Sequence, residues 1–282
     1  MNPPLTGNPR RVPAAAGFAW LAQSLFLVRR QAGRLLLLAL LMQLVLGLTQ
    51  LPLVGLLIIL SVPALNAGLL EAFHVTARDG RPELRLLFRP LASGVHVGRL
   101  FAMGALVFAV GVLSISVMLS GSEELLDPAL LERIEQGDLD AMASLNQETL
   151  GRMALAFLVG LSISGTLSYF TIPLIWFHDR KLGAALGAGL HALLVNWKPF
   201  LALGAGLLLL FLPVALVSGA LFGLAAGGGA MTAIVMGLIM VLLLLFQLML
   251  FGTQYCAFRE IFGMPAGIEP PPAAGSDGQL VA

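Results

Sequence analysis

The chain has 282 residues, of which 58% are apolar and 11% are charged. Soluble domains carry about 25% charged residues, so this composition excludes an ordinary water-soluble domain and indicates an α-helical membrane protein. The net charge of +1 gives no reason to expect nucleic acid as a partner, and the single cysteine, Cys256, excludes an intrachain disulfide and a multi-cysteine metal site.

The two ends of the chain differ in composition from its middle. Residues 1–13 and 264–282 are rich in Pro, Gly and Ala, and such segments bury too little apolar surface to offset the entropy of ordering them. We therefore expect a flexible cytoplasmic tail at each end and a single membrane domain over residues 14–263.

The first apolar block, Leu35–Leu70, is too long for one crossing, because a bilayer core of about 30 Å takes about 20 helical residues. Pro52 lacks a backbone N–H and disfavours continued helix, so this block is predicted to be a hairpin. The predicted fold class is an all-α polytopic membrane protein with six transmembrane helices, at Leu35–Thr49, Leu53–Phe73, Leu100–Ser120, Met153–Phe177, Phe200–Leu224 and Met231–Tyr255.

Each predicted hairpin is preceded by a short amphipathic segment, within residues 18–28, 83–91 and 182–197. Their apolar residues recur at spacings of three and four, which is typical of a helix face, and basic helices of this kind lie along the headgroup layer. The inward span ends AFHVTARDG, WFHDRKLG and AFREIFG are also alike. We interpret the chain as three repeats of interfacial helix plus transmembrane hairpin, over residues 14–80, 81–180 and 181–263.

The charges are divided between the two sides of the predicted bundle. With six spans, 14 of the 16 Lys and Arg residues lie on the side of the termini, and the segment 121–151 holds eight of the 15 acidic residues. The positive-inside rule then places the N-terminus and the C-terminus in the cytoplasm. Segment 121–151 is expected to be an acidic helical loop outside the cytoplasm, because Asp127-Pro128 is typical of a helix start.

Three residues near the inner end of span two form a candidate charge cluster at the inner mouth. Glu71, His74 and Arg78 are spaced three and four residues apart, so they share a helix face. An unpaired charge inside a bilayer is costly. Two interpretations stay open: a proton or cation relay, or a snorkelling carboxylate paired with His74 or Arg78.

Span four is more polar than the other spans. Ser162, Thr166 and Tyr169 fall on one helix face. This face is a candidate lining for a polar cavity, together with Gln43 and Gln50, which lie seven residues apart on span one. The alternative is a helix whose hydroxyls bond their own backbone carbonyls, with a bend at Pro173.

The sequence contains no HExxH, GxSxG or Walker-type motif. The four histidines, His74, His96, His178 and His191, lack the spacing of a metal site, so we predict neither a metal nor another cofactor. We expect a non-catalytic protein that passes or holds a small or lipid-like ligand or scaffolds partners, which are membrane lipids and other membrane proteins or a second copy. The alternative is a membrane-embedded lipid-modifying enzyme with a cytoplasmic-face site near Glu71 and the histidines.

Three stretches carry a resemblance to known proteins: TQLPLVGLLIILSVPALNAGLLEA (49–72), IWFHD (175–179) and LVNWKPFL (194–201). Over residues 14–263 the chain resembles an uncharacterised bacterial family of predicted integral membrane proteins. That family is distantly similar to the membrane domain of some glycerophosphodiester phosphodiesterases. The resemblance implies a six-helix protein of the bacterial inner membrane and carries no activity.

Overall fold

The computed structural model describes residues 9–264, except 52, 121–128, 130, 131, 134–146 and 226–229. Within these ranges all regular structure is helical, because the apolar sequences satisfy their backbone polar groups within each segment, as a lipid environment requires. In chain order the elements are α1 (Ala16–Arg30), α2 (Ala32–Gly47), η1 (Leu48–Gln50), α3 (Val54–Ala77), η2 (Leu84–Leu87), α4 (Arg89–Ala92), α5 (Val97–Leu119), α8 (Gln147–His178), α9 (Leu182–Val195), α10 (Trp197–Ala225) and α11 (Ala230–Phe262).

Six of the described helices are long and apolar enough to cross a membrane, which confirms the predicted all-helical, multi-pass class. The last candidate span differs most from the prediction, because it continues to Phe262 rather than ending at Tyr255. The candidate spans are Ala32–Gln50, Val54–Ala77, Val97–Met118, Leu150–His178, Trp197–Phe222 and Thr232–Phe262. Most of the acidic segment 121–151 lies outside the described residues.

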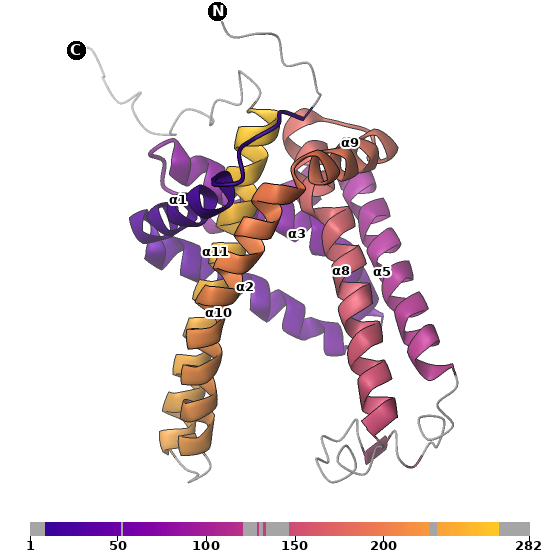
Figure 1. Ribbon diagram of the computed structural model, residues 1–282, viewed down its shortest axis with the longest axis vertical. Helices are drawn as coiled ribbons and strands as arrows, with labels where there is room; N and C mark the ends of the chain where they lie inside the picture. The colour runs from indigo at the N-terminus through magenta and orange to yellow at the C-terminus, as the bar shows by residue number, and fades with distance from the viewer. Residues whose placement is uncertain are drawn as a thin grey trace, which may run out of the picture.

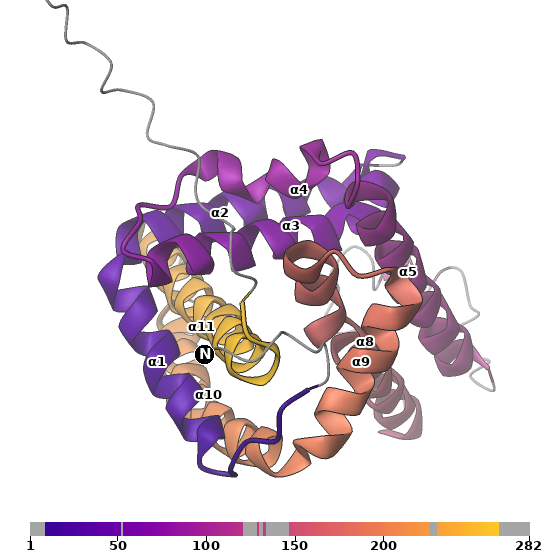
Figure 2. The same cartoon turned by 90° about the horizontal axis from the view of Figure 1, so that it is seen from above.

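A short helical element precedes each pair of long helices, and α1, α4 and α9 lie around the bundle when it is seen from above (Figure 2). The helical element before the second pair of long helices is shorter than predicted. Residues 83–91 form the 3₁₀ turn η2 and the four-residue α4, because Pro90 has no N–H to continue a helix from Leu86. The threefold repeat itself stays a prediction.

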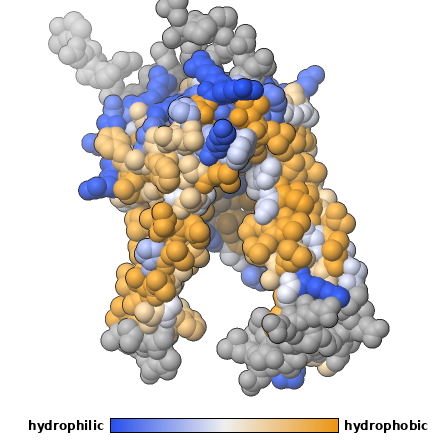
Figure 3. Space-filling view, viewed as in Figure 1, coloured by the Kyte–Doolittle hydropathy of each residue, from blue (hydrophilic) through white to orange (hydrophobic). Residues whose placement is uncertain are grey.

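The long helices form two arms that are joined at one end (Figure 1). The α5/α8 pair and the α10/α11 pair meet through aromatic side chains, with ring centroids of Phe170 5.7 Å from Phe200 and 5.3 Å from Phe262. Away from this junction the arms separate, and Figure 3 shows an open, largely apolar gap between them. We call the joined end the basic end, since it carries Arg30, Arg89, Arg99 and Arg259.

The ends of α3, α8 and α11 that lie at the basic end share a backbone feature. Each helix is followed by a residue with positive φ: Asp79 (64°), Asp179 (52°) and Gly263 (75°). A left-handed residue is a common way to end a helix. The two aspartates also pair with arginines, since Asp79 binds Arg30 and Asp179 binds Arg99.

Helix α1 is packed into the bundle as well as lying at its edge. Trp20 is fully buried, and its indole N–H donates to Glu260 of α11 over 2.6 Å. Gly17 lies against the backbone of α10, where a Cβ would come within 2.2 Å of the Pro199 carbonyl oxygen. The face of α1 opposite Trp20 leaves Phe18 and Phe26 exposed, as the predicted headgroup-layer helix requires.

Part of the predicted N-terminal tail is held in place. The backbone N–H of Val12 donates to Asn196 Oδ1 over 2.9 Å, and Asn196 Nδ2 donates to the Arg10 carbonyl over 3.0 Å. One buried amide thus supplies both a donor and an acceptor to residues 9–13, the described part of this tail, and the flexible tails stay a prediction. Residues 1–8 and 265–282 of the two predicted tails lie outside the described residues.

Candidate functional site

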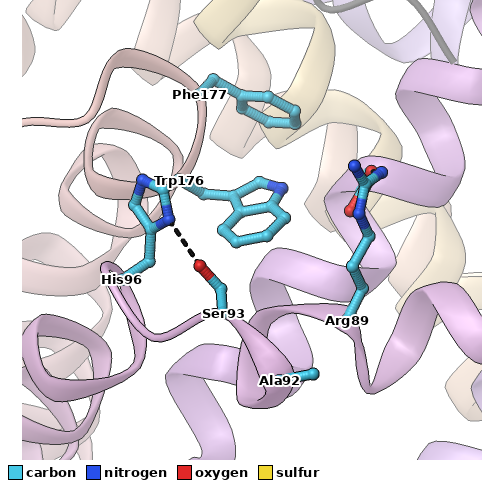
Figure 4. A pocket seen from close by; sticks show the side chains of 7 residues that line it. Arg89, Ala92, Ser93, His96, Trp176 and Phe177 are labelled. Carbon is cyan, nitrogen blue, oxygen red and sulfur yellow. Dashed lines mark hydrogen bonds and ion pairs between the residues drawn. The ribbon is translucent and has the colours of Figure 1, made fainter. Parts of the chain in front are cut away.

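A pocket of about 420 Å³ opens at the basic end, between the ends of α3 and α8 and the connection from α4 to α5. It is lined by Glu71, Arg89, Ala92, Ser93, His96, Trp176 and Phe177 (Figure 4). Glu71 lies six residues before the end of α3, or about 9 Å along the axis. The pocket therefore lies between one and two helical turns from the end of this candidate span.

Glu71 is the charged group at the base of this pocket. The residue is 4% exposed, and its Oε1 pairs with the guanidinium of Arg89, whose side chain is 47% exposed. The other carboxylate oxygen, Oε2, is buried and makes no hydrogen bond of normal geometry with the described residues, while the Trp176 side chain gives the carboxylate a weaker hydrogen-bond contact. The ion-pair partner of Glu71 is thus Arg89, not His74 or Arg78 as predicted, because the chain after α3 folds back and brings α4 against it.

His74 points to a different set of residues. Its Nδ1 lies 3.1 Å from the hydroxyl of Tyr255 on α11, and its ring packs 5.6 Å from that of Phe177. Arg78 ends α3 as its C-cap residue. The predicted inner-mouth cluster is therefore divided in the structure: Glu71 lines the pocket, while His74 belongs to the contact between α3 and α11.

A second set of polar contacts forms the pocket wall beside α5. Ser93 Oγ lies 2.8 Å from His96 Nδ1, and His96 Nε2 lies 3.2 Å from Asp179 Oδ1. Arg99 donates to the same Asp179 oxygen over 2.6 Å. The imidazole of His96 stands edge-on to the indole of Trp176, with ring centroids 5.1 Å apart. Figure 4 shows the Trp176 ring between His96 and Arg89.

Sequence reasoning did not gather these residues into a site. Arg89 was assigned to an interfacial helix, Trp176 to a span boundary, and His96 to a scattered histidine set. Ser93-x-x-His96 was a usable signal, since residues three apart at a helix start can bond each other. Among the described residues, no group of three His, Cys, Asp or Glu side chains is placed to hold a metal ion.

The candidate polar face of span four does not meet its predicted partners. Gln43 Nε2 donates to Gln247 Oε1 of α11 over 2.8 Å, and Gln50 is exposed near the α2–α3 turn. Ser162 and Thr166 are exposed on α8. Gly160, about 200° around the helix from Ser162, faces Ser114 of α5. The face of α8 that carries Ser162 and Thr166 therefore points away from α5.

Tyr169, the third member of that face, lies at the junction of the two arms. Its ring packs edge-on to Phe200 of α10 at 5.5 Å. Its hydroxyl is buried and makes no hydrogen bond of normal geometry with the described residues, while the Thr253 side chain gives it a weaker hydrogen-bond contact. The structure thus places Tyr169 where the gap between the arms closes and leaves Ser162 and Thr166 on the continuation of the same face.

No family model matches the chain, and no curated protein or solved structure is significantly similar to it. The resemblance noted for residues 14–263 is not tested by these comparisons and stays a prediction. The pocket has to be interpreted from its own chemistry.

Proposed function

We propose that this protein is a non-catalytic, multi-pass protein of the bacterial inner membrane that holds a lipid-like ligand in the Glu71 pocket. The observation that carries the proposal is the buried Oε2 of Glu71, which makes no hydrogen bond of normal geometry with the described residues and belongs to a side chain that lines a pocket of about 420 Å³. A buried acceptor without a donor costs free energy. A ligand that supplies the donor recovers that free energy, which gives a basis for specific binding.

The orientation belongs to the same proposal. The arginines of the basic end support a cytoplasmic position for this end and for both termini. A reporter inserted at Gly137 is then expected to be active outside the cytoplasm, and one at Gly183 inside it. Opposite signals from the two insertions would place the pocket on the other side of the membrane.

The threefold repeat and the family resemblance are also part of this proposal. Support for the repeat comes from the three inward helix ends, which share a residue with positive φ. A short helical element before each pair of long helices supports it further.

Ligand binding is tested by thermal unfolding of the purified protein in detergent with added bacterial polar lipid. Lipid is expected to raise the melting temperature of the unaltered protein without being converted. Ala92→Phe should reduce the increase, because Ala92 lines the pocket and a phenyl ring would occupy part of its volume. Val95→Phe, at an exposed position outside the pocket lining, is the matched control. An equal increase in both variants would contradict the proposal.

A second function, lipid hydrolysis, is favoured by one observation: the chain of contacts from Ser93 through His96 to Asp179. These are the residue types of a nucleophile, a base and an orienting carboxylate. The Asp179 carboxylate is shared with Arg99, however, so it does not serve His96 alone. Covalent labelling of the membrane-embedded protein by a fluorophosphonate, lost in Ser93→Ala, would favour the enzyme.

A further inference from the structure

We infer that the Glu71 pocket selects a zwitterionic group that joins a primary ammonium to a phosphate, the chemistry of a phosphoethanolamine headgroup. This inference rests on the proposed ligand-holding function and names the class of ligand. It depends on two opposite charges that line one pocket, Glu71 and Arg89.

The ammonium position follows from Glu71. Its Oε1 is occupied by Arg89, and its buried Oε2 makes no hydrogen bond of normal geometry with the described residues. An ammonium group offers three N–H donors and a positive charge, so it satisfies this oxygen better than a neutral hydroxyl. Trp176 lines the same pocket, with the nitrogen of its indole on the side that faces Arg89 (Figure 4).

The phosphate position follows from Arg89. A guanidinium has five N–H donors, and the contact with Glu71 uses only its Nη1. The side chain is 47% exposed and lines the pocket, so donors remain available for a ligand. Arginine binds phosphate through paired donors, which gives both strength and orientation.

The charge balance decides between headgroup classes. Glu71 and Arg89 sum to zero, so a zwitterion brings each of its charges against an opposite one. A purely anionic headgroup satisfies Arg89 but leaves Glu71 Oε2 without a donor. A trimethylated ammonium retains the charge but has no N–H to donate. The order of affinity should therefore be phosphatidylethanolamine first, with phosphatidylcholine and phosphatidylglycerol weaker.

The test is lipid titration of the full-length protein in detergent, followed by native mass spectrometry with these three lipids of identical acyl chains. Phosphatidylethanolamine is expected to bind about tenfold more tightly than either competitor, the size of one charge-assisted hydrogen bond. Glu71→Gln should reduce this preference to about twofold or less. Asp79→Asn removes the carboxylate of another Arg pair at the same end, outside the pocket lining, and should leave the preference unchanged.

The outcomes separate the two proposals. The inference is overturned if phosphatidylglycerol binds as tightly as phosphatidylethanolamine or more tightly, or if the preference survives Glu71→Gln. The proposed function still holds in that case, provided that lipid binding depends on the pocket. Lipid binding that is unaffected by Ala92→Phe overturns both. The ranking of the three lipids needs no substitution, so it decides the inference even if Glu71→Gln does not fold.

A soluble competitor separates the two sources of this headgroup. If glycerophosphoethanolamine displaces the lipid, the site binds the headgroup alone. A free metabolite of this class could then use the same site. Failure to displace it identifies an intact lipid as the ligand, held also by its acyl chains. Both results agree with the inference, provided that the lipid ranking holds.

Discussion

Gln254 of α11 donates a hydrogen bond of 2.7 Å to the backbone carbonyl of Tyr169 on α8. Pro173 lies four residues further along α8, and its missing N–H leaves that carbonyl without its helical partner. The side chain of one helix thus supplies the donor that a proline removes from another. The bond lies at the junction of the two arms, beside the contact between Tyr169 and Phe200.

This relationship predicts a coupling between two substitutions. Gln254→Leu should lower the free energy of unfolding by about 1 kcal/mol, the usual range for a hydrogen bond between membrane helices. In a Pro173→Ala background the same change should cost clearly less, because the N–H restored at position 173 bonds the Tyr169 carbonyl. Unfolding in detergent, measured for all four proteins, gives the coupling energy. Equal costs in the two backgrounds would refute the assignment.

The contact between α3 and α5 predicts opposite results for two glycines of one helix. A Cβ at Gly104 would come within 2.1 Å of the Leu60 carbonyl oxygen, whereas a Cβ at Gly111 meets nothing within 4 Å. Gly104→Ala should therefore destabilise the protein by about 1–3 kcal/mol, since α3 and α5 must move apart. Gly111→Ala should be neutral or stabilise by up to about 1 kcal/mol. Thermal unfolding of both variants tests the close approach.

The Glu71–Arg89 pair predicts that one substitution rescues another. Arg89→Met leaves a buried carboxylate without its cation and should cost about 3 kcal/mol of stability. Adding Glu71→Gln should recover most of this loss, because no charge then remains buried. Arg30→Met is the control: its partner Asp79 has a side chain 69% exposed, and exposed pairs contribute only about 0–1 kcal/mol. A double variant no more stable than Arg89→Met alone would show that the lost stability has another cause.

The gap between the arms predicts graded labelling along one face of α8. In a Cys256→Ser background, Ser162→Cys and Thr166→Cys should react with a membrane-impermeant maleimide added from outside the cytoplasm, because both positions are exposed. Tyr169→Cys should be protected at the junction with Phe200. Protection of all three positions would mean that lipid, rather than water, fills this part of the gap.

The membrane class of the fold could be predicted from composition, because a long run of apolar residues has few alternatives to a spanning helix. The predicted spans also contain the correct break at the α2–α3 turn. The length of helix in the η2–α4 segment was predicted too long. Its apolar spacing is typical of a helix, but Pro90 interrupts it. The holding of residues 9–13 could not be predicted, because it depends on the side chain of Asn196, more than 180 positions away in the chain.

The pocket could be predicted only in part, for a similar reason. Glu71 was identified because placing a carboxylate within a transmembrane helix costs free energy, so such a residue indicates a functional site. The predicted ion-pair partner of Glu71 was wrong. A sequence shows which residues are neighbours on one helix, but it does not show that the segment with Arg89 folds back against α3. Ser93 and His96 lie in the connection from α4 to α5 and Trp176 lies on α8, so only the packing of this connection against α8 brings the three residues together.

The contact between Trp20 and Glu260 joins residues 240 positions apart, which has a consequence for the synthesis of the protein. At about 5–20 residues per second, roughly 10–50 s pass between the emergence of α1 from the ribosome and that of its partner helix. During this interval α1 has no α11 to cover Trp20, Ser24 and Leu27, all buried in the finished protein. The membrane surface or an insertion factor must shelter them until translation is nearly complete. A chain that stops before α11 therefore exposes an apolar N-terminal helix, a signal that quality-control proteases can recognise.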